Sequence, residues 1–255
     1  MSYACQGFYN FSVSEFLVQF KYEYIRIKMI KWKIRHLIVI LFASLSVYLI
    51  EQSSDWTEMH SWNRAAGGTS LFMIACALII GPLTKIFPRS KWILPWRREL
   101  GIYAVIFALI HITIIIVEWV DWDLFLLFGF ESDPSLEGYI MTQRGFGISN
   151  LLGVVAIFYG FLLAFSSNDL SQKFLGGSAW KFLQQAAHIF WILVLLHTAY
   201  FLYFHFLDFD KDLPEPSWLK IPFLILIVVV ISLRIIAYIK MVKRQRQQRT
   251  DEISN

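Results

Sequence analysis

The 255-residue sequence contains little cysteine and little charge. Its two cysteines, Cys5 and Cys76, form neither a CxxC pair nor the framework of a disulfide-bonded domain, so cysteine chemistry can be set aside as the basis of function. Charged residues make up 16% of the chain and hydrophobic residues 57%, which excludes an ordinary soluble domain. The net charge of +4 comes from short basic clusters between apolar runs, a pattern that reports membrane topology rather than a nucleic-acid-binding face.

Targeting signals and nucleotide-binding motifs are also missing. Residues 1–28 carry charged and aromatic side chains throughout and lack the short apolar core of a cleavable signal peptide. The segment from Met29 to Arg35 is typical of a cytoplasmic start before a membrane helix, and we expect Met29 to be the initiator. No GxGxxG motif follows a strand-like segment, so these residues contain no flavin or nicotinamide domain.

Six apolar segments are each long enough to cross a bilayer. We therefore expect an all-α, polytopic membrane protein with a six-helix bundle, and the absence of repeats and long linkers predicts one domain. The bundle is expected over residues 34–239, after a cytoplasmic N-terminal segment at 1–33 and before a basic cytoplasmic tail at 240–255. The expected spans are 34–51, 66–84, 100–120, 146–165, 182–206 and 218–239.

Lysine and arginine lie mainly on one side of these spans. An even number of spans places both ends on the same side, and basic clusters mark the cytoplasmic side. Both termini are therefore expected in the cytoplasm. The basic clusters lie at 21–35, 85–98, 173–181 and 234–249; the acids of the opposite side are Asp55, Glu58, Asp121, Asp123, Glu131, Asp133, Glu137, Asp208, Asp210, Asp212 and Glu215.

Two histidines, His111 and His197, lie deep inside the third and fifth spans, which run in the same direction. At 1.5 Å per residue they lie about 18 Å and about 24 Å from the cytoplasmic ends, both past the middle of a core about 30 Å thick. Imidazoles at a common depth in a bundle can hold a haem iron from both sides. The alternative is that each ring hydrogen-bonds a neighbouring helix. We interpret His111 and His197 as axial haem ligands.

Three further side chains are candidates for cofactor binding. Arg64 and Arg144 flank spans on the outer side, where guanidinium groups could pair with haem propionates, and interfacial anchoring is the alternative. His188 precedes His197 by nine residues and lies closer to the cytoplasm. It could bind a propionate or a flavin, join a proton path, or serve as a core histidine.

Four local motifs resemble the ferric-reductase-like transmembrane superfamily. Within it, they are similar to the haem-binding membrane subunit of periplasmic methionine-sulfoxide reductase systems. The resemblance implies one or two b-type haems in a six-helix domain and identifies His111 and His197 as its retained ligands. The motifs are His60-Ser-Trp-Asn-Arg64 with Ala77 to Leu83; Arg97-Arg98-Glu99-Leu100-Gly101 with His111; Leu163 to Ser167 with Leu175-Gly176 and Trp180-Lys181-x-Leu183; and Leu196-His197.

The sequence departs from this pattern at the inner haem. Superfamily members with two haems carry a second histidine thirteen or fourteen residues before each retained one, and here those positions are Arg97 and Gln184. We therefore expect a single outer haem, held by His111 and His197. A second haem involving His188 remains the alternative.

The resemblance implies an electron-transfer subunit of the bacterial inner membrane rather than a complete enzyme. A cytoplasmic flavin reductase or quinol would be the donor, with FMN or quinone as further cofactors, and a periplasmic methionine-sulfoxide reductase the acceptor. One alternative is a metalloreductase that delivers electrons to ferric or cupric chelates. Another is a transporter or assembly factor without a redox cofactor, against which the lack of inward acidic residues and paired discontinuous helices argues.

Overall fold

The computed structural model describes residues 13–53, 57–135, 138–205 and 218–254. Within these ranges, six helical segments are long and apolar enough to cross a membrane, which confirms the helical class and the number of spans. Six of the predicted outer acids lie outside the described residues, namely Asp55, Glu137, Asp208, Asp210, Asp212 and Glu215. Residues 1–12 and Asn255 lie outside them as well.

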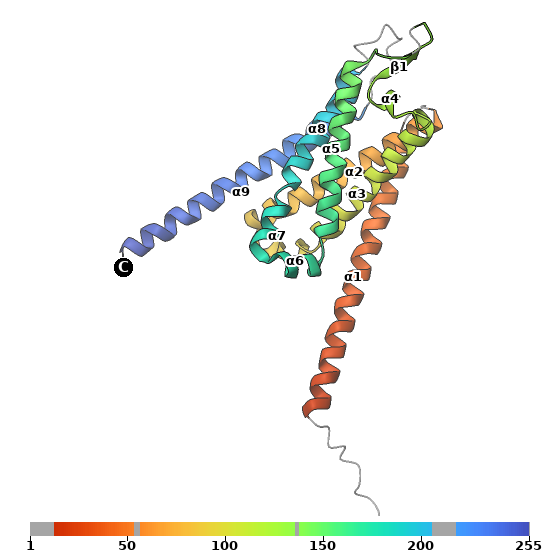
Figure 1. Cartoon of the computed structure of the whole chain (residues 1–255). Coiled ribbons are helices and arrows are strands. Elements are labelled where there is room, and N and C mark those ends of the chain that lie inside the picture. The colour runs from red at the N-terminus through yellow and green to blue at the C-terminus, as the bar shows by residue number, and fades with distance from the viewer. Residues whose placement is uncertain (1–12, 54–56, 136–137, 206–217, 255) are drawn as a thin grey trace, which may run out of the picture.

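The first and last helices are longer than the spans that the sequence predicts. The first lies in α1 (Val13–Glu51), which begins well before residue 34, and the last in α9 (Lys220–Ser254), which continues as helix through the predicted tail. Both helices reach beyond the bundle on the side of α6 and α7 (Figure 1). The others are α2 (Glu58–Ile86), α3 (Trp96–Ile114) continuing into η2 (Ile115–Trp119), α5 (Arg144–Ser166), and α8 (Ala187–Ala199) continuing into η3 (Tyr200–Phe204).

Helix α2 is the central element of the bundle. It contacts α1, α3 and α9, and it is the most buried of the six spans. Small residues such as Ala65, Thr69 and Ala75 are fully buried, so neighbouring helices approach its backbone closely. The Ser70 hydroxyl donates a hydrogen bond to the Ala104 carbonyl oxygen at 2.7 Å and ties α2 to α3. A second pair, α5 and α8, packs beside them.

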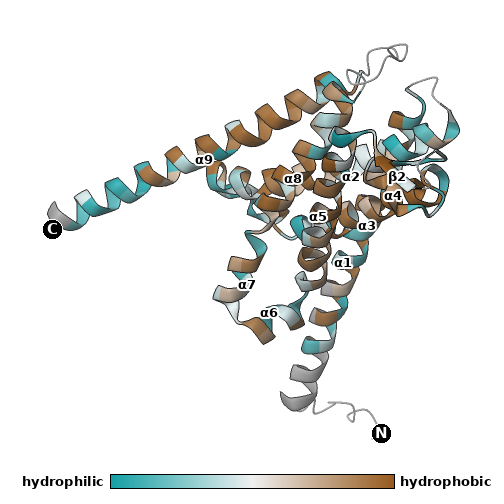
Figure 2. Cartoon of the chain, turned by 45° about the horizontal axis from the view of Figure 1, so that its top comes forward, coloured by the Kyte–Doolittle hydropathy of each residue, from teal (hydrophilic) through white to brown (hydrophobic). Residues whose placement is uncertain are grey.

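The predicted span over 182–206 lies within one membrane-spanning segment, Gly177–Phe204, whose helix is interrupted. Helix α7 (Gly177–Gln184) ends before α8 begins at Ala187, and two tight turns link them, with Gln185 N–H donating to Phe182 and Ala186 N–H to Leu183. The inner connections are η1 (Pro88–Ile93) and α6 (Asp169–Leu175). Hydrophobic residues cover the helices within the bundle, whereas the C-terminal part of α9 is hydrophilic (Figure 2).

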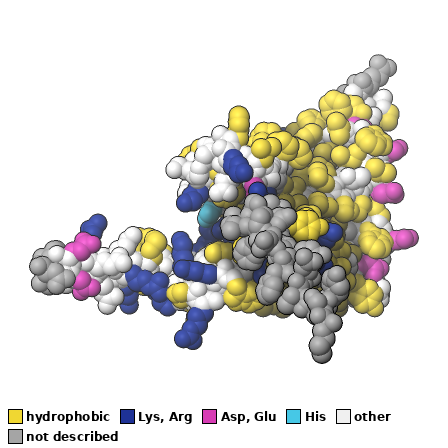
Figure 3. All heavy atoms as spheres, turned by 90° about the horizontal axis from the view of Figure 1, so that it is seen from below, with side chains coloured by type: hydrophobic (Ala, Val, Ile, Leu, Met, Phe, Trp, Pro, Cys, Tyr) yellow, Lys and Arg dark blue, Asp and Glu magenta, His cyan; other side chains and the backbone are white. Residues whose placement is uncertain are grey.

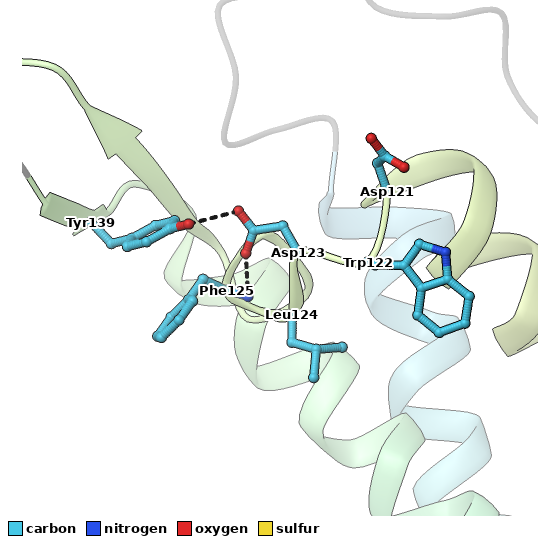
Figure 4. A pocket seen from close by; sticks show the side chains of 6 residues that line it. All are labelled: Asp121, Trp122, Asp123, Leu124, Phe125 and Tyr139. Atoms are coloured by element: carbon cyan, nitrogen blue, oxygen red, sulfur yellow. Dashed lines mark hydrogen bonds between the residues drawn. The ribbon is translucent and has the colours of Figure 1, made fainter.

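A small cap covers the end of the bundle that the sequence predicts to face outward, between α3 and α5. It consists of α4 (Leu124–Leu127) and an antiparallel hairpin of β1 (Phe130–Asp133) and β2 (Gly138–Met141). The Asp123 carboxylate accepts hydrogen bonds from the Phe125 backbone N–H at 2.9 Å and from the Tyr139 hydroxyl at 3.0 Å (Figure 4). The Asn150 amide donates to the Leu127 carbonyl oxygen at 2.9 Å and attaches the cap to α5.

Candidate functional site

The structure brings His111 of α3 and His197 of α8 together inside the bundle. Their ring centroids are 6.3 Å apart and their planes are nearly perpendicular, at 83°. Residues 86 positions apart thus meet inside the bundle, because α3 and α8 both pack on α2 and α5. Among the described residues, no group of three or more His, Cys, Asp or Glu side chains is arranged to hold a metal ion, so this site offers a pair of imidazoles rather than a larger ligand cluster.

Each histidine donates its Nδ1–H to a backbone carbonyl of a neighbouring helix. His111 Nδ1 lies 3.0 Å from the Asn63 carbonyl oxygen of α2, and His197 Nδ1 lies 2.8 Å from the Ser149 carbonyl oxygen of α5. A carbonyl oxygen can only accept, so Nδ1 carries the proton in both rings. The unprotonated Nε2 atom is therefore the one that can bind a metal ion.

A glycine lies one helical turn after each carbonyl and makes room for the ring. A Cβ atom added to Gly67 would lie 3.0 Å from His111 Nδ1, and one added to Gly153 would lie 2.9 Å from His197 Nδ1. Any larger residue would push the imidazole away from its carbonyl partner. The repeated arrangement of a carbonyl, a glycine four residues later and an imidazole makes two matching cradles.

Both histidine-bearing helices change geometry within about one turn after the histidine. The π-helical segment η2 begins at Ile115, and η3 begins at Tyr200. The Ser149 hydroxyl adds a reciprocal bond by donating to the His197 carbonyl oxygen at 3.2 Å. Single π-helical turns occur frequently at functional sites, because they redirect the side chains around them.

The pair matches the requirements of a haem iron held from two sides. Two metal–nitrogen bonds of about 2 Å each, together with the distance from each nitrogen to its ring centre, separate the ring centroids by about 6 Å. The observed separation is 6.3 Å. The protonation of both Nδ1 atoms and the space left by Gly67 and Gly153 agree with this use. The residues present therefore fit a bis-imidazole haem.

A family model described as "Ferric reductase like transmembrane component" matches residues 65–193, just over half of the chain. The chain belongs to the ferric-reductase-like transmembrane family. The matched region contains Gly67, His111, Gly153 and the inner positions Arg97 and Gln184, and it ends before His197.

Two of the relatives that the chain resembles are named as heme-binding subunits. The chain is 26% identical over 134 residues to the protein-methionine-sulfoxide reductase heme-binding subunit MsrQ of Ralstonia nicotianae, covering 52% of this chain and 55% of that protein. It is 24% identical over 156 residues to MsrQ of Herminiimonas arsenicoxydans, covering 61% and 65%. It is also 29% identical over 135 residues to the magnetosome protein MamZ of Magnetospirillum gryphiswaldense, covering 53% of this chain and 19% of MamZ. Each match thus spans less than two thirds of the relative.

The other sequence-predicted residues do not join the histidine pair. Arg64 lies half-buried in α2 and interacts electrostatically with His60, whereas Arg144 begins α5 with an exposed side chain. His188 is exposed at the start of α8, and its Nδ1–H donates to the Gln185 carbonyl oxygen of its own chain segment at 2.9 Å. Their assignment to a cofactor remains a proposal.

The residues at the inner ferric-reductase positions make other contacts. The Gln184 amide donates to the Ser166 hydroxyl at 3.1 Å, and Trp180 Nε1 donates to the Ser166 carbonyl oxygen at 2.9 Å, so both attach α7 to the end of α5. The Arg97 guanidinium lies over Gly81 of α2, where an added Cβ would meet Nη1 at 3.5 Å. Neither position presents a metal ligand.

Sequence reasoning missed the supports of the histidine pair. Asn63, Gly67, Ser149 and Gly153 are not among the candidate residues that the sequence identifies. The common spacing of four residues in Asn63–Gly67 and Ser149–Gly153 is a signal in the sequence, but it gains meaning only when each pair is placed opposite a histidine.

Proposed function

We propose that this chain is a membrane electron-transfer subunit that holds one b-type haem between His111 and His197. The observation that carries the proposal is the pair of imidazoles 6.3 Å apart, each with its Nδ1–H bonded to a backbone carbonyl. Membership of the ferric-reductase-like family and similarity to two heme-binding MsrQ subunits support the choice of haem.

The contribution of the chain is to fix two neutral ligands in a dry bundle. When bound, haem supplies a one-electron Fe(III)/Fe(II) couple. His111 and His197 would hold the iron, and a haem held by two imidazoles would suit outer-sphere electron transfer better than oxygen chemistry. The Asn63 and Ser149 carbonyl groups hold the rings in the required tautomer, and such supports also raise the basicity of the ligand nitrogen. Arg64 and Arg144 are proposed to pair with the haem propionates.

The proposed electron path runs from the cytoplasmic side of a bacterial inner membrane to the periplasm. The donor is a cytoplasmic flavin reductase or quinol, with FMN or quinone at the inner end. The acceptor is a periplasmic methionine-sulfoxide reductase, whose substrate takes two electrons and two protons to give methionine and water.

The decisive experiment follows the haem absorption bands of the full chain in nanodiscs. We expect a flavin reductase with NADH to reduce the haem and a methionine-sulfoxide reductase with methionine sulfoxide to reoxidise it. A His197→Ala variant is the control, because it lacks one ligand. Reoxidation by ferric citrate without the soluble reductase would instead indicate a metalloreductase. A colourless protein after expression with ample haem would contradict both and indicate a transporter or assembly factor.

A further inference from the structure

A second polar cluster lies at the opposite end of the histidine-bearing helices. It consists of Arg97 in the first turn of α3, His188 in the first turn of α8, and Arg234 in the middle of α9. Arg97 and Arg234 interact electrostatically with each other, and both interact with His188. Seen from below, lysine and arginine side chains gather beside a histidine (Figure 3). Side chains from three separate helices therefore concentrate positive charge in one region of the structure.

No carboxylate in the described parts of the chain forms an ion pair with Arg97 or Arg234. The neighbouring acids have other partners: Glu99 pairs with Arg35 at 2.8 Å, and Asp169 pairs with Arg98 at 2.8 Å. Arg234 Nε is buried, and no atom of the described residues accepts a hydrogen bond from it. The cluster is thus a concentration of positive charge with unused donor capacity.

The position of Arg234 makes this charge costly. It lies 14 residues after Lys220 in a helix apolar enough to cross a membrane, where a charged side chain faces the bundle or a polar ligand. An anion that contacts both guanidinium groups offsets the repulsion between them. Phosphate suits this position because the paired N–H donors of a planar guanidinium group can bind two of its oxygen atoms. An anion between them removes the repulsion and satisfies the free donors.

His188 and Lys240 add to the donors and positive charge at this end of the bundle. The His188 Nδ1–H is engaged with Gln185, so Nε2 is available to a bound group. Lys240 Nζ donates to the Ile86 carbonyl oxygen at 2.7 Å, which fixes α9 against the end of α2 and adds a further positive charge two turns after Arg234. Basic pockets between membrane helices on the cytoplasmic side are typical binding places for phosphorylated head groups.

We propose that Arg97, His188 and Arg234 form a phosphate-binding site between α3, α8 and α9. The ligand is a phosphate ester or phosphate ion, which either an anionic lipid of the inner leaflet or a soluble phosphate compound can supply. The site is distinct from the His111–His197 pair and does not depend on haem being bound there.

The test measures binding of two phosphate sources to the full chain. Native mass spectrometry counts phosphatidylglycerol retained on protein from phosphatidylglycerol nanodiscs. Thermal unfolding in phosphatidylcholine nanodiscs, with and without inorganic phosphate at constant ionic strength, tests the soluble source. We expect wild-type protein to retain the anionic lipid or to melt at a higher temperature with phosphate. The first result assigns a lipid headgroup and the second a soluble ligand.

The variants Arg97→Gln and Arg234→Gln decide whether these side chains are responsible. Each should bind the active probe about tenfold more weakly, because each removes a charge-assisted hydrogen-bond donor. Arg244→Gln is the matched control, since Arg244 is an exposed arginine on the same helix. Size-exclusion chromatography and circular dichroism show which variants are folded. One folded variant of the two is enough to decide the test. Equal binding by wild type and folded variants, or no binding of either probe, would overturn the proposal and leave the arginines as topological charges.

Discussion

The outer and inner levels of the same helices carry different chemistry. At the outer level, His111 and His197 lie 6.3 Å apart, and each ring rests on a glycine and bonds a carbonyl of the adjacent helix. At the inner level, Gln184 bonds Ser166 and Arg97 lies over Gly81. The paired histidines thus have both a carbonyl partner and a glycine on a neighbouring helix, whereas Arg97 and Gln184 have other contacts.

His188 illustrates the same difference. Its Nδ1–H is bonded, as in the two buried histidines, but the acceptor is Gln185, three residues earlier in its own chain segment, and the ring is exposed. The break between α7 and α8 lies directly before it. A neighbouring helix therefore does not hold this ring in the way that α2 holds His111.

The largest effect is expected from filling the two cradles. Gly67→Ala and Gly153→Ala place a Cβ at 3.0 Å and 2.9 Å from the Nδ1 atoms of His111 and His197, so the rings must shift from their carbonyl partners. We expect haem affinity to fall about 10- to 100-fold, as for other lost supports of metal ligands. Titration of apoprotein with haem measures this.

Gly101→Ala is the matched control for these variants. A Cβ at Gly101 meets no atom within 4 Å, and alanine has the higher helix propensity. Its haem affinity should equal that of the wild type. Unchanged affinity in Gly67→Ala and Gly153→Ala as well would contradict the role of the cradles.

The largest effect on the stability of the fold, as distinct from haem affinity, is expected at the ion pair between Glu99 and Arg35. The Glu99 side chain is 1% exposed and Arg35 is 23% exposed, whereas the Arg98–Asp169 pair is 40% and 69% exposed. Glu99→Gln leaves the Arg35 charge without its buried partner and should cost about 3 kcal/mol. Asp169→Asn should cost less than about 1 kcal/mol. Melting temperatures in detergent rank the two, and a reversed order would show that the Glu99–Arg35 pair does not anchor α3.

A smaller effect is expected from restoring a histidine at the inner level. Gln184→His supplies one ring at the position used by two-haem relatives, but the facing position is still Arg97. A pyridine haemochrome count should stay at the wild-type value. A second haem in this single variant would break the proposed contrast between the levels and would require a ligand from elsewhere.

The smallest effect is confined to the outer cap. The pKa of Tyr139 is raised because its hydroxyl donates a hydrogen bond to Asp123, with burial and the negative charge of Asp123 contributing in that order. Because the folded pKa is the higher one, this bond stabilises the cap below the ordinary tyrosine pKa of about 10 and is lost as pH rises through the folded value. Phenolate absorbance, relative to Tyr139→Phe, should appear at higher pH than in Asp123→Asn. The haem bands should be the same in all three proteins.

The sequence was sufficient for the number of spans, because apolar length is a local signal. It also singled out His111 and His197, which the structure brings close together, while their use as haem ligands stays a prediction. It did not reveal the break at Gln185 and Ala186, since both neighbouring segments are apolar and no proline or glycine marks the turn. The Glu99–Arg35 pair was also missed, because arginines near span ends were interpreted as topological charges. Contacts between Asn63 and His111, or Ser149 and His197, depend on tertiary packing alone.

The central claim is a single haem held by two named histidines. The most direct measurement is the oxidised and dithionite-reduced absorption spectrum of the purified chain, with a pyridine haemochrome count, for wild type and the His111→Ala, His197→Ala and His188→Ala variants. We predict one six-coordinate b-type haem per chain in wild type and in His188→Ala, and loss of the six-coordinate spectrum in the other two. A wild-type spectrum that persists in His111→Ala or His197→Ala, or two haems per wild-type chain, would contradict the account.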